Sequence, residues 1–469
     1  MELPFNFIAF FLFLAFVLCL IKEWKRSKAA QKLPPSPLKL PVIGNMHHLV
    51  GSPPHHALRK LARQHGALMH LQLGEISSIV VSSPHLAKEI MKTHDLAFAN
   101  RAEFLTSKIL MYNSSDIACC PYGDYWRQMR KICTLELLSA KNVRSFGSIR
   151  QDEASHLVAS VQALATAGEL INISEKLYSY TSSMILHPLL SAKSQLVKIH
   201  LKMDKLLGNI IDQHIDNLAR TNMATGESGN EDLIDVLLRV KESGDLQFPI
   251  TNNNIKAIVI DVFSAGTETS STTVEWAMSE MVRNPNVMAK AQSEIRTAFK
   301  GKKKIEETDI QELKYLRLVI KETLRLHPPG PLLVPRECRE ECEIEGYTIP
   351  VKTRVLINAW AIGRDPDYWN DPESFKPERF KSNPVDFTGT HFEYLPFGAG
   401  RRMCPGISFG LANVHLPLAL LLYHFDWKLP DGLDPCDLDM SETVGITASR
   451  KDSLRLLATS YDPYLQKPY

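Results

Sequence analysis

The apolar positions of this chain recur mostly with a helical period. They fall at i, i+3 and i+4 over residues 124–138, 150–165, 197–219, 251–283, 285–300 and 309–326. The alternation typical of strands is confined to residues 67–73, 76–82, 344–349 and 353–357. Neither a repeat nor a second linker interrupts the chain after Val42. The pattern predicts one body, residues 42–469, that is mainly α with small β-sheets.

The N-terminus has a different pattern. Leu3 to Ile21 is almost wholly apolar, close to the roughly 20 residues that cross a bilayer, and a basic cluster follows it. The positive-inside rule therefore predicts one N-terminal transmembrane helix, residues 1–22, with the rest of the chain in the cytosol. A cleaved signal peptide is the alternative, but the basic start and small-residue cleavage site that it needs are missing. The basic and proline-rich residues 23–41 predict a stiff linker.

Composition narrows the class of protein. The chain has 469 residues, of which 44% are hydrophobic and 23% charged, with a formal net charge of +2. These are globular proportions, and the balanced charge gives no reason to expect nucleic acid as a partner. The 8 cysteines form no CxxC pair, which disfavours a zinc site and predicts reduced thiols.

One loop concentrates candidate chemistry. Leu395 to Gly406 contains glycines, two arginines and Cys404, and an apolar helix is expected directly after it, from Ile407 to Tyr423. A cysteine near a helix N-terminus is favoured as thiolate by the helix dipole. A buried cysteine with no function is the alternative, and it is the commoner case for a lone cysteine.

The stretch FGAGRRMCPG, residues 397–406, resembles the haem-binding loop of the cytochrome P450 monooxygenases. The resemblance implies that Cys404 is the thiolate ligand of haem iron, which favours O–O cleavage. It also implies that Phe397 and Arg402 belong to the haem site. The expected fold is the cytochrome P450 fold behind one transmembrane helix.

Residues 265–270, AGTETS, lie within a predicted helix. A polar helix face would explain them without any function, since Ser and Thr there compete for backbone hydrogen bonds. The segment resembles the family's oxygen-activation motif. By that resemblance Gly266 makes room beside the haem, Thr269 donates a hydrogen bond to dioxygen, and Glu268 helps to deliver protons.

Two further charged patterns match the same family. Glu322 and Arg325 share a helix face, and the resemblance makes them a buried brace completed by Arg379, although an exposed helix pair is the ordinary interpretation. The segment WRQMR resembles the family's haem-edge helix. It implies propionate contacts for Trp126 and Arg130, and the same role is implied for Arg336 and Arg402.

The chain resembles plant endoplasmic-reticulum members of the family, particularly those that oxidise terpenoids. The resemblance implies haem b as cofactor, O2 as oxidant, and electrons from NADPH through NADPH-cytochrome reductase. Apolar positions expected beside a lipophilic substrate are Ile258, Val259, Val262, Leu332, Leu333, Val334, Val444 and Ile446. A relative that rearranges peroxides or dehydrates oximes is disfavoured by intact Glu268 and Thr269.

One region departs from the family. A helix is expected from about Tyr178 to Leu186, a loop follows over residues 187–191, and a basic helix opens near Lys198. Relatives carry a further helix between them, which roofs the substrate pocket. The departure predicts an internal deletion near residues 185–192. An open pocket admits water, so the alternative function is a haem-binding but catalytically impaired variant.

Overall fold

The computed structural model describes residues 32–181, 193–224 and 232–461, except positions 245, 301, 303, 304, 431 and 444. A few positions between 10 and 18 are also described, and they are helical. Most of the predicted anchor, residues 1–22, therefore lies outside the described residues. So does the predicted deletion near residues 185–192.

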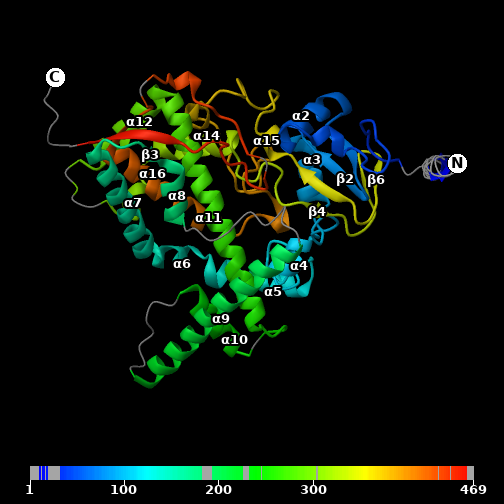
Figure 1. Ribbon diagram of the computed structural model, residues 1–469, viewed down its shortest axis with the longest axis horizontal. Helices are drawn as coiled ribbons and strands as arrows, with labels where there is room; N and C mark the ends of the chain where they lie inside the picture. The colour runs from blue at the N-terminus through cyan, green and yellow to red at the C-terminus, as the bar shows by residue number, and fades with distance from the viewer. Residues whose placement is uncertain are drawn as a thin grey trace, which may run out of the picture.

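Helices form the larger part of the protein, at the left and bottom of Figure 1. The central one is α11 (Asn252–Arg283), which begins where the Thr251 hydroxyl accepts a hydrogen bond from the Asn254 N–H. It packs against α8 (Ile173–Thr181) and α16 (Ile407–His424). Because α11 crosses the whole helical part, side chains from several other elements pack against it.

Some of the remaining helices pack around α11 and α16, and others lie with the main sheet at the opposite end of the molecule (Figure 1). They are α2 (Pro54–His65), α3 (Pro84–Lys88), α4 (Leu105–Leu110), α5 (Asp124–Ile132), α6 (Ala140–Ser145), α7 (Gly147–Ala167), α9 (Lys193–Ala224), α10 (Leu233–Glu242), α12 (Pro285–Ala298), α13 (Glu307–Ile310), α14 (Lys314–Leu326) and α15 (Ala359–Ile362). Short 3-10 or π turns are η1 (Met46–Leu49), η2 (Glu89–Thr93), η3 (Cys133–Leu137), η4 (Pro377–Phe380), η5 (Gly400–Arg402) and η6 (Pro435–Asp437).

The main sheet lies with α2 and α3 at the other end of the molecule (Figure 1). Its strand order is β1-β2-β7-β4, formed by β1 (Leu68–Leu73), β2 (Ile76–Val81), β7 (Arg354–Ile357) and β4 (Arg336–Glu337). β1 and β2 are antiparallel, with Leu68 opposite Val81, and β2 pairs parallel with β7. Smaller sheets are β3 (Ile171–Asn172), β9 (Arg455–Ser460) and β8 (Phe425–Lys428), and β5 (Cys342–Ile344) with β6 (Tyr347–Ile349).

The structure confirms most of the predicted elements, with three corrections. The strand-like stretch 344–349 is part of a hairpin, because a turn joins Ile344, the last residue of β5, to Tyr347, the first residue of β6. The predicted helix over 309–326 is divided into α13 and α14, because residues 311–313 form a turn. The helix expected from Tyr178 begins earlier, as α8, at Ile173. Periodicity alone missed this start because Ile173 is also the first residue after β3, where its N–H bonds the Leu454 carbonyl.

The described part of the predicted linker is extended but docked onto the body. The Pro35 carbonyl accepts from the His70 N–H, and the Lys32 carbonyl accepts from the Thr348 N–H. Within the described residues, α16 is long and apolar enough to cross a membrane, but half of it is buried inside the protein. It is therefore a core helix here, and it follows directly on the loop that contains Cys404.

Candidate active site

Cys404 lies at the end of a tightly bonded loop before α16. Its N–H donates to the Phe397 carbonyl at 3.0 Å, and the Met403 N–H donates to Gly400 at 3.0 Å. The Cys404 side chain is accessible to solvent, yet protein surrounds the sulfur closely enough that burial raises the pKa of the thiol. The Gly406 N–H and the Arg130 guanidinium lower this pKa again. The loop thus presents an accessible sulfur with groups that stabilise its thiolate form.

Asp95 connects this loop to the main sheet, since it bonds both Arg401 of the loop and Arg336 of β4. Its carboxylate accepts from the Arg401 N–H at 2.9 Å and from Arg336 Nη1 at 2.9 Å. Gly400 has φ +69°, and a Cβ there would lie 2.1 Å from the Met91 carbonyl oxygen. Only glycine fits at this position, because it adopts the left-handed conformation and lets two backbone segments approach.

Four arginines converge beside the Cys404 loop. Arg130 Nη2 donates to the Met403 carbonyl at 2.6 Å, and Arg336 Nη2 donates to the Ala399 carbonyl at 2.6 Å. Arg402 donates to the carbonyls of residues 99, 117 and 120, at 2.7, 3.3 and 2.6 Å. Burial, with the Arg402 and Arg336 charges, holds the pKa of Arg101 well below its usual range. This concentration of buried positive charge suits an anionic group.

Trp126 contributes through its ring as well as through its N–H. Its Nε1 donates to the Ile117 carbonyl at 3.0 Å, and the Arg402 guanidinium lies 4.3 Å from the ring centroid. The predicted propionate contact of Trp126 therefore stays a prediction, since a protein carbonyl takes its N–H in this structure. The structure does bring Trp126, Arg130, Arg336 and Arg402 to the same region as the Cys404 loop.

The motif of residues 265–270 lies in the middle of α11. The Thr269 hydroxyl donates to the Ala265 carbonyl at 2.6 Å, one turn earlier. A Cβ on Gly266 would lie 3.2 Å from Phe409 Cε1, five residues beyond Cys404. Gly266 thus lets α11 approach α16. Whether it also borders the haem stays a prediction.

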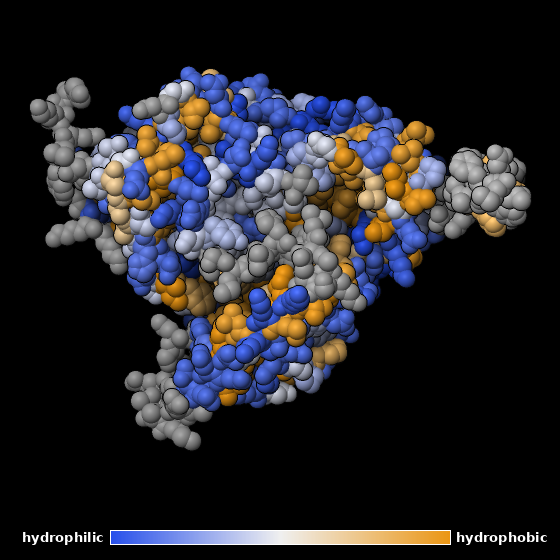
Figure 2. Space-filling model, viewed as in Figure 1, coloured by the Kyte–Doolittle hydropathy of each residue, from blue (hydrophilic) through white to orange (hydrophobic). Residues whose placement is uncertain are grey.

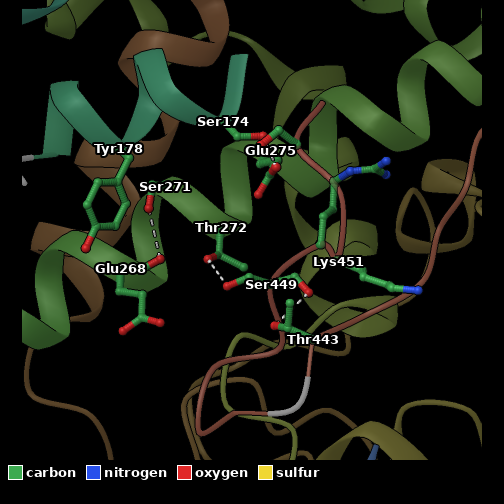
Figure 3. A pocket seen from close by; sticks show the side chains of 11 residues that line it. Ser174, Tyr178, Glu268, Ser271, Thr272, Glu275, Thr443, Ser449 and Lys451 are labelled. Carbon is green, nitrogen blue, oxygen red and sulfur yellow. Dashed lines mark hydrogen bonds between the residues drawn. The ribbon is translucent and has the colours of Figure 1, made fainter. Parts of the chain in front are cut away.

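Glu268 borders a polar cavity of about 330 Å³ on the side of α11 that α8 covers. Figure 3 shows the Tyr178 ring of α8 above the Glu268 side chain, and serine, threonine and lysine side chains of the C-terminal segment opposite. Burial and the nearby Glu268 charge raise the pKa of Tyr178. The Glu268 carboxylate thus has access to water and to hydroxyl groups.

The three residues of the predicted brace are in direct contact. Arg325 Nε and Nη2 donate to the two Glu322 oxygens, each at 2.8 Å, and Arg379 Nε donates to Glu322 Oε1 at 2.8 Å. The remaining Arg325 donors bond the carbonyls of Gly363, Pro372 and Ser374. The side chains of Glu322 and Arg325 are both 0% exposed, so the pair is fully removed from water.

The apolar residues expected beside a substrate lie in different surroundings, and their contact with a substrate stays a prediction. Ile258 is fully buried in a cluster formed with α5 and α10. Val334 and Ile446 are exposed, and Val444 lies outside the described residues.

Sequence reasoning also missed four charged residues of the site: Asp95, Arg101, Asp116 and Asp261. Arg101 donates to the carbonyls of Ala118, Val334 and Pro335. No local motif singles out these residues, since each acts on partners far away in the sequence. The one sequence signal for any of them was Asp261, an acidic residue that lies two turns before Thr269 on the same predicted helix.

The comparisons with known proteins agree with this geometry. The sequence matches the family described as Cytochrome P450 over residues 34–198 and 185–455. It is 57% identical to premnaspirodiene oxygenase of Hyoscyamus muticus, covering 98% of this chain and 99% of the relative. It is 54% identical to 5-epiaristolochene 1,3-dihydroxylase of Nicotiana tabacum, with the same coverage. A solved zebrafish cytochrome P450 with abiraterone superimposes with TM-score 0.74 at 25% identity, over 87% of this chain and 99% of the other.

Haem is the cofactor that this family implies, and the residues present fit it. The Cys404 sulfur is accessible at the end of its loop, as an axial iron ligand requires, and the Gly406 N–H and the Arg130 guanidinium oppose the rise in its pKa that burial causes. The buried arginines provide donors for carboxylates such as haem propionates. The chain therefore belongs to the cytochrome P450 monooxygenases, and its similar relatives include plant enzymes that oxidise terpenoids.

Proposed function

We propose that the protein hydroxylates a lipophilic plant secondary metabolite, a terpenoid, using O2 and electrons from NADPH-cytochrome reductase. The observation that carries this proposal is the meeting of the accessible Cys404 sulfur with the buried arginine cluster. The printed activities of the two plant relatives support the substrate class. In this proposal haem b binds with Cys404 as iron ligand, and Trp126, Arg130, Arg336 and Arg402 face its propionates.

The bound haem supplies the redox chemistry of oxygen activation. The protein supplies position, charge and protons. Arg130 and the Gly406 N–H favour the thiolate form of Cys404 against burial, which raises the pKa of the thiol, and Phe397 fixes the loop through its carbonyl. Glu268 takes protons from the polar cavity beside α8 and passes them toward the neighbouring Thr269 hydroxyl. The brace of Glu322, Arg325 and Arg379 keeps the supporting core rigid.

A reduced carbon monoxide spectrum of the purified full chain tests the ligand. We expect the thiolate-type Soret band, and we expect Cys404→Ser to lose it. Cys436→Ser is the matched control, since Cys436 is another exposed free cysteine, far along the chain from the site loop. Persistence of the band in Cys404→Ser would disprove the assignment of Cys404.

The second candidate is a haem-binding variant with impaired turnover, and a specific observation favours it. The alignment with premnaspirodiene oxygenase extends over 502 positions, whereas this chain has 469 residues. The two ranges that match the family overlap at residues 185–198, and the deletion that the sequence predicts lies there. On α9, just after this point, Val197, Leu201, Leu206 and Ile215 are exposed, and Figure 2 shows apolar side chains over the lower lobe that contains α9. Exposed apolar side chains are what removal of a covering helix would leave.

NADPH consumption with reductase and a panel of terpenes separates the two candidates. Product formed in proportion to NADPH supports the monooxygenase. A normal Soret band, with NADPH oxidised and its electrons used only to reduce O2 to hydrogen peroxide, supports the impaired variant, because water entering an open pocket diverts the electrons.

We further propose that residues 1–22 anchor the protein in the endoplasmic-reticulum membrane, with the catalytic body in the cytosol. Phe10, Phe11 and Phe13 are exposed on a helix, as a lipid-facing segment requires. Alkaline carbonate should leave the full chain in the membrane and release a chain that lacks residues 1–22. Asn113 is exposed within an Asn-Ser-Ser triplet, and glycosylation of it would contradict a cytosolic body.

A further inference from the structure

Asp261 is a buried carboxylate on α11, two turns before Thr269, and is 7% exposed. Its Oδ2 accepts the N–H groups of Ile117 and Ala118, both at 3.1 Å. These residues belong to the loop between α4 and α5. A single side chain of the central helix therefore holds two consecutive peptide groups of that loop.

The peptide group between Ile117 and Ala118 connects Asp261 to the arginine cluster. Its N–H end donates to Asp261. Its carbonyl end, the Ile117 oxygen, accepts from Trp126 Nε1 at 3.0 Å and from Arg402 Nη1 at 3.3 Å. A peptide with a carboxyl group at one end and a guanidinium group at the other is polarised, so both hydrogen bonds are strengthened.

The next peptide group of the loop repeats the arrangement on its carbonyl side. The Ala118 carbonyl accepts from Arg101 Nε at 3.0 Å. The Cys120 carbonyl accepts from Arg402 Nη2 at 2.6 Å. The loop carbonyls thus set the positions of Arg101, Arg402 and Trp126, and Asp261 sets the orientation of the loop.

We propose that Asp261 is a positioning residue for the haem edge, which orients the 117–118 peptide so that its carbonyl holds the Trp126 ring against the Arg402 guanidinium and thereby places Arg402 for the propionates. This inference rests on the proposed function, because the propionate role of Arg402 belongs to it. Asp261 has no contact with the cofactor in this proposal. It acts through the loop.

The acceptor oxygen of Asp261, and not its negative charge, performs this role. Burial and the charge of Asp116 raise the pKa of Asp261 to about 8, so the group can be neutral at neutral pH. Burial likewise raises the pKa of Asp116. Among the described residues, Asp116 Oδ1 has no hydrogen-bond partner. An asparagine at position 261 keeps one acceptor oxygen at the right distance, whereas leucine keeps none.

The test compares Asp261→Asn and Asp261→Leu in the full-length holoprotein. Amide hydrogen exchange is measured by mass spectrometry on peptides that cover residues 115–120, and haem retention by transfer to apomyoglobin. Glu275→Leu is the matched control. Glu275 is another buried carboxylate on α11, and it accepts a hydrogen bond from the Ser174 hydroxyl, far from this loop.

In Asp261→Leu we expect both exchange in residues 115–120 and haem transfer to be faster by about tenfold or more, because two buried N–H groups lose their acceptor. In Asp261→Asn both rates should stay within about threefold of the unmodified chain. Glu275→Leu should leave exchange in this loop unchanged. If Asp261→Leu does not fold, Asp261→Ala replaces it in the same comparison.

Two outcomes would overturn the proposal: unchanged loop exchange in Asp261→Leu, or an Asp261→Asn protein as perturbed as Asp261→Leu. Failure of the proposed function is distinguishable from both. It would appear as an unmodified chain that binds no haem, and the exchange measurement would still decide whether Asp261 orders the loop.

Discussion

The buried pair of Glu322 and Arg325 offers the most quantitative test of what holds the core together. The perturbation is Glu322→Gln, which keeps the size and shape of the side chain and removes its charge. The carboxylate accepts four hydrogen bonds, each at 2.8 Å: two from Arg325, one from Arg379 Nε and one from the Lys376 N–H. In glutamine, one of the two acceptor oxygens is replaced by an NH2 group. At least one N–H of the surrounding arginines or of Lys376 would then point at this NH2 group, which is itself a donor.

The expected loss follows from these contacts. Removing one partner of a buried ion pair typically costs 3–5 kcal/mol, because the other charge stays buried without compensation. Arg325 still has the carbonyls of Gly363, Pro372 and Ser374 around its guanidinium. We therefore expect the lower end of that range, about 3 kcal/mol. This is a large share of the 5–15 kcal/mol typical of a folded domain.

Urea unfolding of the full chain in detergent, followed by circular dichroism, measures the difference. With a slope of about 3 kcal/mol/M, the midpoint of Glu322→Gln should fall by about 1 M. Asp371→Asn is the matched control. It breaks the Lys376–Asp371 pair, whose side chains are 52% and 67% exposed, and should leave the urea midpoint nearly unchanged because solvent screens an exposed ion pair. Equal midpoints for the two variants would refute the brace.

Three further predictions use other parts of the site. Gly400 and Gly168 both have φ +69°. A Cβ added at Gly400 would lie 2.1 Å from the Met91 carbonyl oxygen, whereas at Gly168 no described atom lies within 4 Å of it. Gly400→Ala should therefore lose the thiolate-type carbon monoxide spectrum, and Gly168→Ala should keep it. Asp261 has a pKa raised from 3.8 to about 8, so the folded protein binds the extra proton and ionisation costs stability as pH rises through that window; relative to the unmodified chain, Asp261→Asn should become more stable between about pH 4 and pH 8, and a constant difference in thermal midpoint would contradict this. A lysine in Arg402→Lys cannot reach the three carbonyls that Arg402 bonds through its planar guanidinium. Haem transfer to apomyoglobin should therefore be faster by about tenfold, and an unchanged rate would count against a role for the guanidinium geometry.

The sequence was most informative where chemistry is encoded in neighbouring residues. The Cys404 loop, the Glu322–Arg325 pair and the AGTETS segment each occupy one turn or one loop, so their spacing specifies most of their geometry. Helical periodicity similarly predicted α11 and α12 almost to their ends. It failed between α13 and α14, where a turn interrupts the helix while the apolar period continues.

The amino-acid sequence by itself determined the family, the expected iron ligand and the mainly helical architecture. Only the tertiary structure decided which charges share one buried site. Asp95 and Arg336 are 241 positions apart, and Asp261 lies 144 positions from Ile117, yet both contacts are within hydrogen-bonding distance. A local motif records which side chains are neighbours along one element. The balance of buried arginines against buried carboxylates depends on how distant elements pack, and it is this packing that makes Asp261 a neighbour of the arginine cluster.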